Sequence, residues 1–315
     1  MNCGFWEKLA RPIIALAPMA NVTDAAFRRI IAKYGKPDIF FTEFVSADGL
    51  LSTGREKLLT DLLYSESERP IVAQLFSGKP EKMFEAARLI KELGFDGLDI
   101  NMGCPDRSIE KSGAGAALIK NPALAREILR AAKEGAGGLP VSLKTRLGYN
   151  KDELEQWLPE LLAEKPTAIT LHARTRKEMS QVPARWERVK QAVEIRNELK
   201  SQTLILGNGD VTSVAEAREK IKETGADGAL LGRAIFGNPF LFLNSQEYQN
   251  KLAVLLEHAK LFEELLGKYK NFAIMRKHFK AYVEGFPGAK ELRMRLMETE
   301  NAQEVEKILY NGSYV

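Results

Sequence analysis

Short apolar runs recur along the chain and alternate with longer amphipathic segments. Segments such as EKMFEAARLIKELG (81–94) and PALAREILRAAKEG (122–135) repeat their apolar residues at helical spacing and end at glycine. The short runs are five residues long and rich in Ile, Leu, Val or Phe, which is typical of buried strands. They are IIALA (13–17), IFFTE (39–43), IVAQL (71–75), GLDIN (97–101), PVSLK (140–144), AITLH (168–172), TLILG (203–207) and GALLG (228–232).

The spacing of these runs favours an α/β fold, a closed (β/α)8 TIM barrel. Consecutive strand ends lie 24 to 43 residues apart, which is the size of one strand–helix unit. Eight such units over about 235 residues match the usual length of a TIM barrel. A doubly wound open sheet is the alternative, but its dinucleotide-binding fingerprint is missing. The stretch GAGAA (113–117) resembles it only superficially, because it does not directly follow a strand.

The strand pattern stops after about residue 243. The segments SQEYQNKLAVLLEHAKLFEELLGKYK, NFAIMRKHFKAYVEGF and AQEVEKILY beyond it have helical periodicity alone. We therefore expect a catalytic barrel over residues 1–243 and a C-terminal all-helical domain over residues 244–315.

The composition is that of an ordinary soluble protein, with 45% hydrophobic and 28% charged residues among 315. Cys3 and Cys104 are the only cysteines, so the sequence offers no disulfide framework and indicates a reducing compartment. The first residues, MNCGFWEKLARP, lack the apolar core of a signal peptide, and no apolar stretch is long enough to span a bilayer. We expect a cytoplasmic monomer that binds no membrane.

The net charge of +4 does not by itself indicate a nucleic-acid partner, but its distribution is uneven. Between Lys268 and Arg295 the sequence has eight Lys or Arg residues and two Glu residues, with His278 among them. A solvated helical face would explain this excess as well as a polyanion-binding surface would.

In a TIM barrel the C-terminal ends of the strands build the active site, so polar residues at these ends are the candidate site. Cys104 lies on a Gly-Cys-Pro turn after a strand, where a thiol is placed to react, whereas a structural thiol would more naturally lie inside the strand. The residues at the strand ends are Pro18, Met19, Glu43, Gln74, Asn101, Cys104, Lys144, Arg146, His172, Arg174, Asn208, Gly209, Asp210, Gly232 and Arg233.

Several of these residues indicate a bound anion or a polar ring. The last two strands end in GNGD and GRAIFGNP, whose freed backbone amides suit a phosphate or serve only tight turns. Lys144 is a candidate cation beside a flavin ring, a Schiff-base lysine or a simple rim ion pair. Gln74 can hydrogen-bond along a polar ring edge.

The remaining polar residues at the strand ends are less specific. His172 is either a core histidine or a ligand contact, and Glu43 either an inter-strand ion pair or a ligand contact. Asp99 shares a strand face with Asn101 and is assigned only to orientation or structural pairing. The three histidines and two cysteines have no metal-ligand spacing, so we predict no metal site.

An ordered set of motifs resembles the bacterial-type tRNA-dihydrouridine synthases and covers nearly the whole chain. The C-terminal stretch RKHFKAYVEGFPGAKELR is similar to the helical domain of that family. The most specific motif is DINMGCP, around Cys104. The motifs are LAPMANVTDAAFRR, AQLF, DINMGCP, KTRLG, HARTR, GNGD and LGRAIFGNP.

The resemblance implies a flavin-dependent oxidoreductase that reduces the C5–C6 bond of tRNA uridines to 5,6-dihydrouridine, with FMN re-reduced by NADPH. Cys104 would protonate C5 while hydride from the flavin reaches C6. The residues implied to bind FMN are Pro18, Met19, Ala20, Gln74, Lys144, His172, Asn208, Gly209, Asp210, Gly232 and Arg233. The residues implied to bind the tRNA substrate are Asn101, Arg174, Arg276, Lys277 and His278.

The chain departs from the family pattern at two places. It has His172-Ala173-Arg174 where His-Gly-Arg is common, and EMSQVPARW lacks the usual Tyr and Gly, so residues 177–185 carry no inferred contacts. Two other functions remain as alternatives: an FMN barrel reductase of a small pyrimidine, and a tRNA-binding chaperone without catalysis. The basic C-terminal segment argues against the first, and retention of Cys104 and Lys144 against the second.

Overall fold

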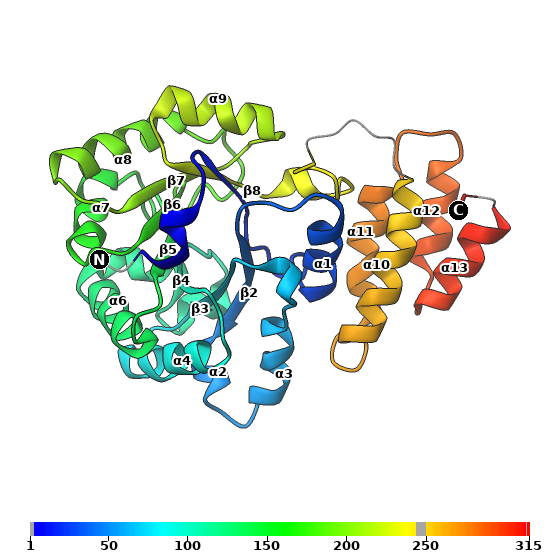
Figure 1. Cartoon of the computed structure of the whole chain (residues 1–315), viewed down its shortest axis with the longest axis horizontal. Coiled ribbons are helices and arrows are strands. Elements are labelled where there is room, and N and C mark those ends of the chain that lie inside the picture. The colour runs from blue at the N-terminus through cyan, green and yellow to red at the C-terminus, as the bar shows by residue number, and fades with distance from the viewer. Residues whose placement is uncertain (1–2, 244–249, 313) are drawn as a thin grey trace.

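The structure is a computed structural model that describes residues 3–243, 250–312 and 314–315. Within these residues, eight parallel strands form one sheet in the order β1-β8-β7-β6-β5-β4-β3-β2 (Figure 1). All eight expected runs are strands. They are β1 (Ile13–Leu16), β2 (Phe40–Ser46), β3 (Ile71–Phe76), β4 (Gly97–Met102), β5 (Val141–Arg146), β6 (Ala168–His172), β7 (Leu204–Asn208) and β8 (Gly228–Leu231).

The sheet curls round so that its two outer strands, β1 and β2, meet. They are joined by a parallel bridge between Ala15 and Ile39, with the Leu16 N–H donating to the Ile39 carbonyl at 3.3 Å. β1 also pairs with β8 along its whole length, from Ile13 opposite Gly228 onward. The predicted TIM barrel is therefore confirmed, and the doubly wound sheet is excluded.

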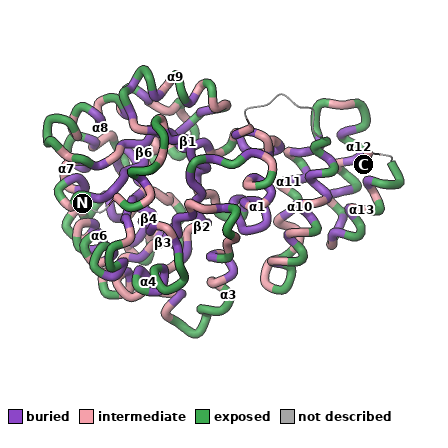
Figure 2. Tube along the Cα trace, viewed as in Figure 1, coloured by how far each residue is buried: buried purple, intermediate pink, exposed green. Residues whose placement is uncertain are grey.

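Alternate residues of the strands face two different cores, which explains their continuous apolar sequences. Ile13 and Ala15 of β1 point to the barrel interior, whereas Ile14 and Leu16 pack against the surrounding helices. Figure 2 shows the buried segments concentrated in the strands and on the inner sides of the helices. Trp6, which is 1% exposed, joins the interior core from a short 3-10 helix before β1.

Helices cover the outside of the sheet. Those of the barrel region are α1 (Ala25–Tyr34), α2 (Ala47–Leu50), α3 (Arg55–Leu59), α4 (Pro80–Glu92), α5 (Arg107–Lys111), α6 (Pro122–Ala136), α7 (Leu154–Ala163), α8 (Trp186–Glu198) and α9 (Val214–Thr224). Their ends follow the expected signals. Asn121 caps α6 with Pro122 in its first turn, and Gly137 ends α6 with a left-handed φ of +51°.

The C-terminal part consists of α10 (Lys251–Leu266), α11 (Met275–Tyr282), α12 (Ala289–Met297) and α13 (Ala302–Asn311). These helices lie to one side of the barrel, with α10 and α11 next to α1 and with α12 and α13 farther away (Figure 1). The expected boundary at residues 243/244 falls at the edge of the described residues, and residues 244–249 lie outside them.

Apolar and aromatic side chains join these helices to the barrel. Phe27 of α1 lies 5.0 Å from the ring of His258 and 4.7 Å from the ring of His278. No helix in the described ranges is both long enough and apolar enough to cross a bilayer.

Candidate active site

A cavity of about 630 Å³ opens at the C-terminal ends of the strands. Ala20 and Glu43 are the two predicted barrel-site residues outside its wall; both line a neighbouring cavity of about 320 Å³, and Phe44 borders both cavities. The predicted residues that line the large cavity are Pro18, Met19, Gln74, Asn101, Cys104, Lys144, His172, Arg174, Asn208, Gly209, Asp210, Gly232 and Arg233. The strand ends thus bring together residues that are far apart in the sequence.

Cys104 lies on a loop after β4 that is anchored by backbone hydrogen bonds. Asn101 Oδ1 accepts from the N–H groups of Gly103 (3.1 Å) and Cys104 (2.9 Å), and the Cys104 carbonyl accepts from the Ala116 N–H (3.0 Å). Gly115 has φ +60°, and a Cβ there would come within 2.9 Å of the Cys104 carbonyl oxygen. Burial raises the pKa of the Cys104 thiol, which favours its protonated form at neutral pH.

Asn101 also ends a chain of buried polar side chains. Its Nδ2 donates to Gln74 Oε1 (3.1 Å), and Gln74 Nε2 donates to Asp99 Oδ2 (2.6 Å). Ser142 donates to the other oxygen of Asp99 at 2.5 Å, which identifies Asp99 as a structural partner. Because Asn101 Oδ1 already accepts two bonds, the residue mainly sets the conformation of the Cys104 loop. The sequence did not reveal this role.

Lys144 provides an unpaired cation in the cavity wall. Its Nζ forms no hydrogen bond or ion pair with any described residue, so the rim ion pair considered above does not exist. Burial, and then the charge of Arg146, lower its pKa to about 8. An ammonium group held in this way favours a ligand that brings negative charge into the cavity.

His172 is neutral and hydrogen-bonded at the same wall. Burial, and then the charge of Lys144, lower its pKa far below the usual value. Arg174 Nη1 lies 3.1 Å from His172 Nε2. Because a guanidinium only donates, Nε2 accepts and the ring proton is on Nδ1. Arg174 also pairs with Asp210, which in turn pairs with Arg233 at 2.7 Å.

The ends of β7 and β8 form a glycine-rich corner beside Arg233. Gly209 has φ +126°, and a Cβ there would lie 2.7 Å from the Cβ of Ala184, so glycine is required for both conformation and space. Asn208 Nδ2 donates to the Leu230 carbonyl at 2.8 Å and ties the two strand ends together. This corner fits a phosphate group, and the Lys144 wall fits the polar edge of a ring.

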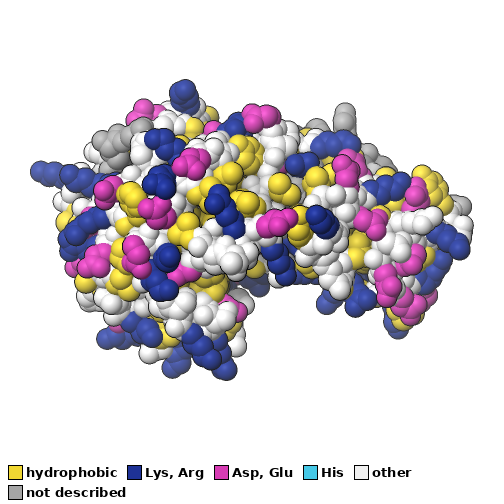
Figure 3. All heavy atoms as spheres, turned by 90° about the horizontal axis from the view of Figure 1, so that it is seen from below, with side chains coloured by type: hydrophobic (Ala, Val, Ile, Leu, Met, Phe, Trp, Pro, Cys, Tyr) yellow, Lys and Arg dark blue, Asp and Glu magenta, His cyan; other side chains and the backbone are white. Residues whose placement is uncertain are grey.

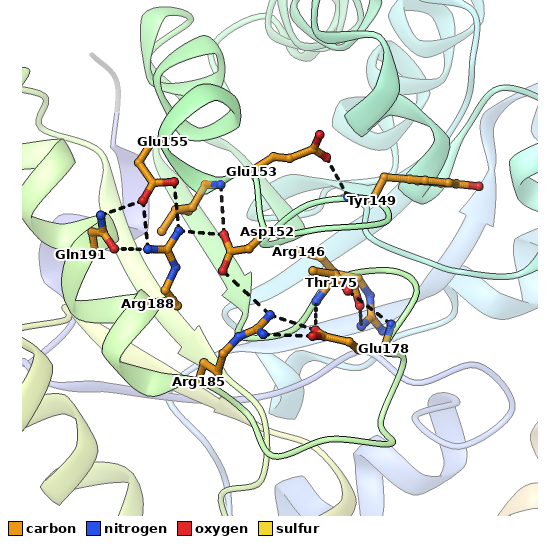
Figure 4. Close-up of polar contacts among 11 residues, drawn as sticks. Arg146, Tyr149, Asp152, Glu153, Glu155, Thr175, Glu178, Arg185, Arg188 and Gln191 are labelled. Carbon is orange, nitrogen blue, oxygen red and sulfur yellow. Dashed lines mark hydrogen bonds and ion pairs between the residues drawn. The ribbon is translucent and has the colours of Figure 1, made fainter.

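Arg146 is a strand-end residue whose role only the structure reveals. Its Nε donates to the Gly103 carbonyl at 2.8 Å, and its Nη1 donates to the carbonyls of Thr175 and Met179, both at 3.1 Å. It therefore joins the Cys104 loop to the loop after β6, as Figure 4 shows in part. Met179 and Ser180 at the tip of that second loop line the cavity.

The loop at residues 175–185, which lacks the expected Tyr and Gly, is held by ion pairs instead (Figure 4). Glu178 accepts two hydrogen bonds of 2.9 Å from Arg185, and Arg185 also lies 3.8 Å from Asp152. Arg188 of α8 pairs with Asp152 at 2.7 Å. These contacts fasten the loop to its neighbours and explain how it is ordered despite its unusual sequence.

The three residues predicted to contact tRNA in the C-terminal part have different environments. Arg276 is exposed and Lys277 is half-buried. His278 is completely buried against Phe27 and against His258, whose ring centre is 4.6 Å away. The prediction that His278 contacts tRNA is therefore wrong, because its side chain lies on the inner face of α11.

The other cations of this segment are mostly accessible. In the view of Figure 3, Lys and Arg side chains lie over both the barrel and the C-terminal helices, interspersed with Asp and Glu. The exposed or half-buried cations of the segment are Lys268, Lys270, Arg276, Lys277, Lys280, Lys290, Arg293 and Arg295, of which the Lys270 side chain is only 12% exposed. No cluster of three or more His, Cys, Asp or Glu side chains able to hold a metal occurs where the structure describes the chain.

Comparisons with known proteins identify the family of this chain. The model of the dihydrouridine synthase (Dus) family matches residues 15–312. A probable tRNA-dihydrouridine synthase of Staphylococcus aureus (strain MRSA252) is 40% identical over 316 residues, covering 98% of this chain and 95% of that protein. Probable tRNA-dihydrouridine synthase 2 of Bacillus subtilis (strain 168) is also 40% identical over 316 residues, with 98% and 96% covered.

Solved structures with a similar fold are more distant in sequence. Morphinone reductase aligns with a TM-score of 0.55 at 13% identity, covering 81% of this chain and 91% of that one. Histamine dehydrogenase from Rhizobium sp. 4-9 aligns with a TM-score of 0.53 at 14% identity, covering 79% and 48%. At these identities the likeness concerns the barrel fold alone.

Proposed function

Because this chain belongs to the dihydrouridine synthase family, we propose that it reduces uridines of tRNA to 5,6-dihydrouridine. The observation that carries the proposal is the content of the large cavity. A protonated cysteine on an anchored loop and an unpaired lysine line the same space, Cys104 after β4 and Lys144 in β5. This pair suits a reaction that needs a proton donor and a bound, negatively charged electron carrier.

The cofactor in this proposal is FMN, with NADPH as the reductant. Lys144 and Gln74 suit the polar edge of the ring, and the corner formed by Gly209, Gly232 and Arg233 suits the phosphate. The other residues proposed to line the cofactor are Pro18, Met19, Ala20, His172, Asn208 and Asp210. A flavin bound here would supply the hydride that the C6 atom of uracil must accept.

Cys104 supplies the proton in this scheme. The Sγ–H bond breaks as a C–H bond forms at C5 of the uracil ring, and the resulting thiolate later takes a proton from solvent. Burial keeps the thiol protonated before the reaction, while the charges of Arg146 and Lys144 favour the thiolate that forms. The anchored loop limits the motion of Sγ and so favours transfer to one ring atom.

The proposal also assigns different functions to the barrel and to the C-terminal helices. The target base must leave its stack to reach a cavity at the barrel rim, so the rest of the tRNA needs a separate surface. The accessible cations of the C-terminal helices, among them the exposed Arg276 and the half-buried Lys277, suit the phosphate backbone. We therefore assign residues 1–243 to catalysis and residues 244–315 to tRNA binding.

The purified protein tests this function directly. We expect the purified protein to contain a flavin with its visible absorbance, and NADPH to reduce that flavin. Transfer RNA that lacks dihydrouridine should then reoxidise the flavin, with one dihydrouridine formed for each flavin reoxidised. Flavin-loaded protein that forms no dihydrouridine on any unmodified tRNA would contradict the proposal. Turnover of a free pyrimidine at any salt concentration would favour the small-substrate reductase, and tRNA binding without flavin would favour the chaperone.

A pair of cysteine variants tests the proposed proton donor. Cys104→Ala should bind flavin and take electrons from NADPH normally but form dihydrouridine at least about 100-fold more slowly, as is typical for loss of a general acid. Cys3→Ala is the matched control, because Cys3 lies before β1, outside the residues that line the cavity. If the two variants form dihydrouridine at equal rates, Cys104 is not the proton donor.

A further inference from the structure

Lys270 forms a buried ionic junction between the C-terminal part and the barrel. It follows α10, and its Nζ lies 2.7 Å from Glu43 Oε2 and 2.6 Å from Asp61 Oδ1. The side chain of Lys270 is 12% exposed and that of Glu43 is 6% exposed. Burial alone would lower the pKa of Lys270, but the two carboxylates raise it to about 12, so the ammonium group stays charged. Lys270 is one of the eight Lys or Arg residues between Lys268 and Arg295, but its charge is paired with two carboxylates of the barrel.

The same carboxylate also holds a loop of the large cavity. The other oxygen of Glu43 accepts a hydrogen bond from the backbone N–H of Asn21. Asn21 belongs to the loop after β1 that carries Met19, which lines the large cavity. Glu43 therefore connects the C-terminal segment, through Lys270, with the wall of the candidate active site.

The contacts of α1 with the C-terminal helices are of a different kind. Phe27 packs against the rings of two buried histidines, which resists separation of the two parts but is not directional. A second ion pair crosses this boundary, between Lys33 and Glu257, but the lysine side chain is 57% exposed. Such exposed pairs contribute little to structure. Tyr34 also donates a hydrogen bond to Glu257 across this boundary at 2.6 Å, but only Lys270 ties the C-terminal segment to two carboxylates of the barrel, one of them buried, among the ion pairs of the described residues.

We propose that Lys270 is a positioning residue for the tRNA reaction: by docking on Glu43 and Asp61, it sets the angle between the basic C-terminal helices and the cavity. That angle determines which uridine of a bound tRNA reaches Cys104. The inference rests on the proposed function. Because α12 lies farther from the barrel than α10 and α11, a small rotation about the α1 contact displaces the cations of α12 more than those of α11 (Figure 1).

The test compares Lys270→Met with Lys33→Met. The methionine keeps an aliphatic stem and loses the charge, and Lys33 is the matched control because its ion pair crosses the same boundary at the surface. We expect Lys270→Met to raise the KM for tRNA about tenfold, which corresponds to about 1.4 kcal/mol. Dihydrouridine should also appear at secondary uridines. Lys33→Met should match the wild type, and Lys270→Arg should restore the wild-type site pattern.

A second variant separates positioning from simple destabilisation. Lys270→Met alone leaves Glu43 buried without its partner, and this unpaired charge can itself disturb the fold. Glu43→Gln with Lys270→Met removes the unpaired charge and keeps an acceptor for the Asn21 N–H. If Lys270 acts by positioning, the double variant should be as stable as the wild type and still modify the wrong uridines.

Three measurements decide the outcome. NADPH should reduce the flavin of the single Lys270 and Lys33 variants at the wild-type rate without tRNA, because neither lysine lines the large cavity. An unchanged tRNA KM and site pattern in Lys270→Met would overturn the inference, as would a site pattern restored in the double variant. Failure of the wild type to form dihydrouridine would instead overturn the proposed function, so the two failures are distinct.

Discussion

Replacing His278 by leucine tests how the C-terminal helices depend on pH. The His278 ring is fully buried beside Phe27 and His258, and neither of its nitrogens has a hydrogen-bond partner among the described residues. Burial, and then the charge of Lys277, lower its pKa to about 3. In the unfolded chain the same group titrates near its ordinary value of about 6.5.

The sign of the effect follows from these two values. Between pH 6.5 and pH 3 the unfolded chain binds a proton that the folded protein excludes, so the free energy of unfolding falls as the pH falls. For one such histidine the loss relative to pH 8 is about 1.4 kcal/mol at pH 5.5 and about 2 kcal/mol at pH 5.0. The pKa of His258 is also lowered by burial, and its loss adds to that of His278.

The assay is urea unfolding of the wild type and of His278→Leu at several pH values between 8 and 5. We expect the two proteins to differ little at pH 8, because the ring makes no hydrogen bond that leucine would lose. At pH 5.0 the variant should have gained about 2 kcal/mol relative to the wild type. Asp24 and Asp99, whose pKa values burial raises to about 6, act in the opposite direction but equally in both proteins.

The quantity to examine is therefore the difference in the free energy of unfolding between the wild type and His278→Leu. If this difference stays constant from pH 8 to pH 5, His278 is protonated in the folded state as easily as in the unfolded chain. That result would refute the assignment of a buried, neutral ring at the contact between α1 and α11.

Three further substitutions have defined expected outcomes. Asn101→Ala removes two hydrogen bonds to the backbone of the Cys104 loop, worth about 2 kcal/mol together, so dihydrouridine formation should fall about 30-fold while flavin reduction by NADPH is unchanged. Lys144→Met should make flavin reduction by NADPH at least about tenfold slower and shift the reduction potential of the flavin to more negative values. An unchanged reduction potential would show that Lys144 does not lie beside the flavin ring. Trp6→Ala should lower the free energy of unfolding by about 3–5 kcal/mol in urea, and a loss below about 1 kcal/mol would show that Trp6 does not close the barrel interior.

The barrel could be predicted from the sequence because each strand is buried on both faces and therefore leaves a continuous apolar run. The same reasoning located the cavity residues, since every parallel strand delivers its last residues to one rim. The roles proposed for Cys104 and Lys144 rest on that placement together with the resemblance of the surrounding motifs. The sequence did not show that the loop after β1 divides its residues, with Pro18 and Met19 in the large cavity and Ala20 in the smaller one.

Three other features could not be predicted because they depend on contacts between distant segments. His278 has the same local sequence context as the exposed Arg276, and only the packing of α11 on α1 decides which of them is buried. Lys270 belongs to a basic cluster in the sequence, but it meets Glu43 more than 200 residues away in the chain. Asn101 was assigned to the substrate on the resemblance alone, and the two hydrogen bonds that its Oδ1 accepts from the following loop depend on how that loop folds.

The pairing of β1 with β8 affects how the chain is made. During translation, β1 is the first strand to leave the ribosome, whereas its pairing partner β8 is made only after nearly the whole barrel. At about 5–20 residues per second this delay is on the order of ten seconds or more. The packing partners of helix α1 are translated even later, because Phe27 packs against α10 and α11. During that time the apolar faces of the first strand and first helix are uncovered, so nascent chains truncated before α10 should be strong clients of holding chaperones.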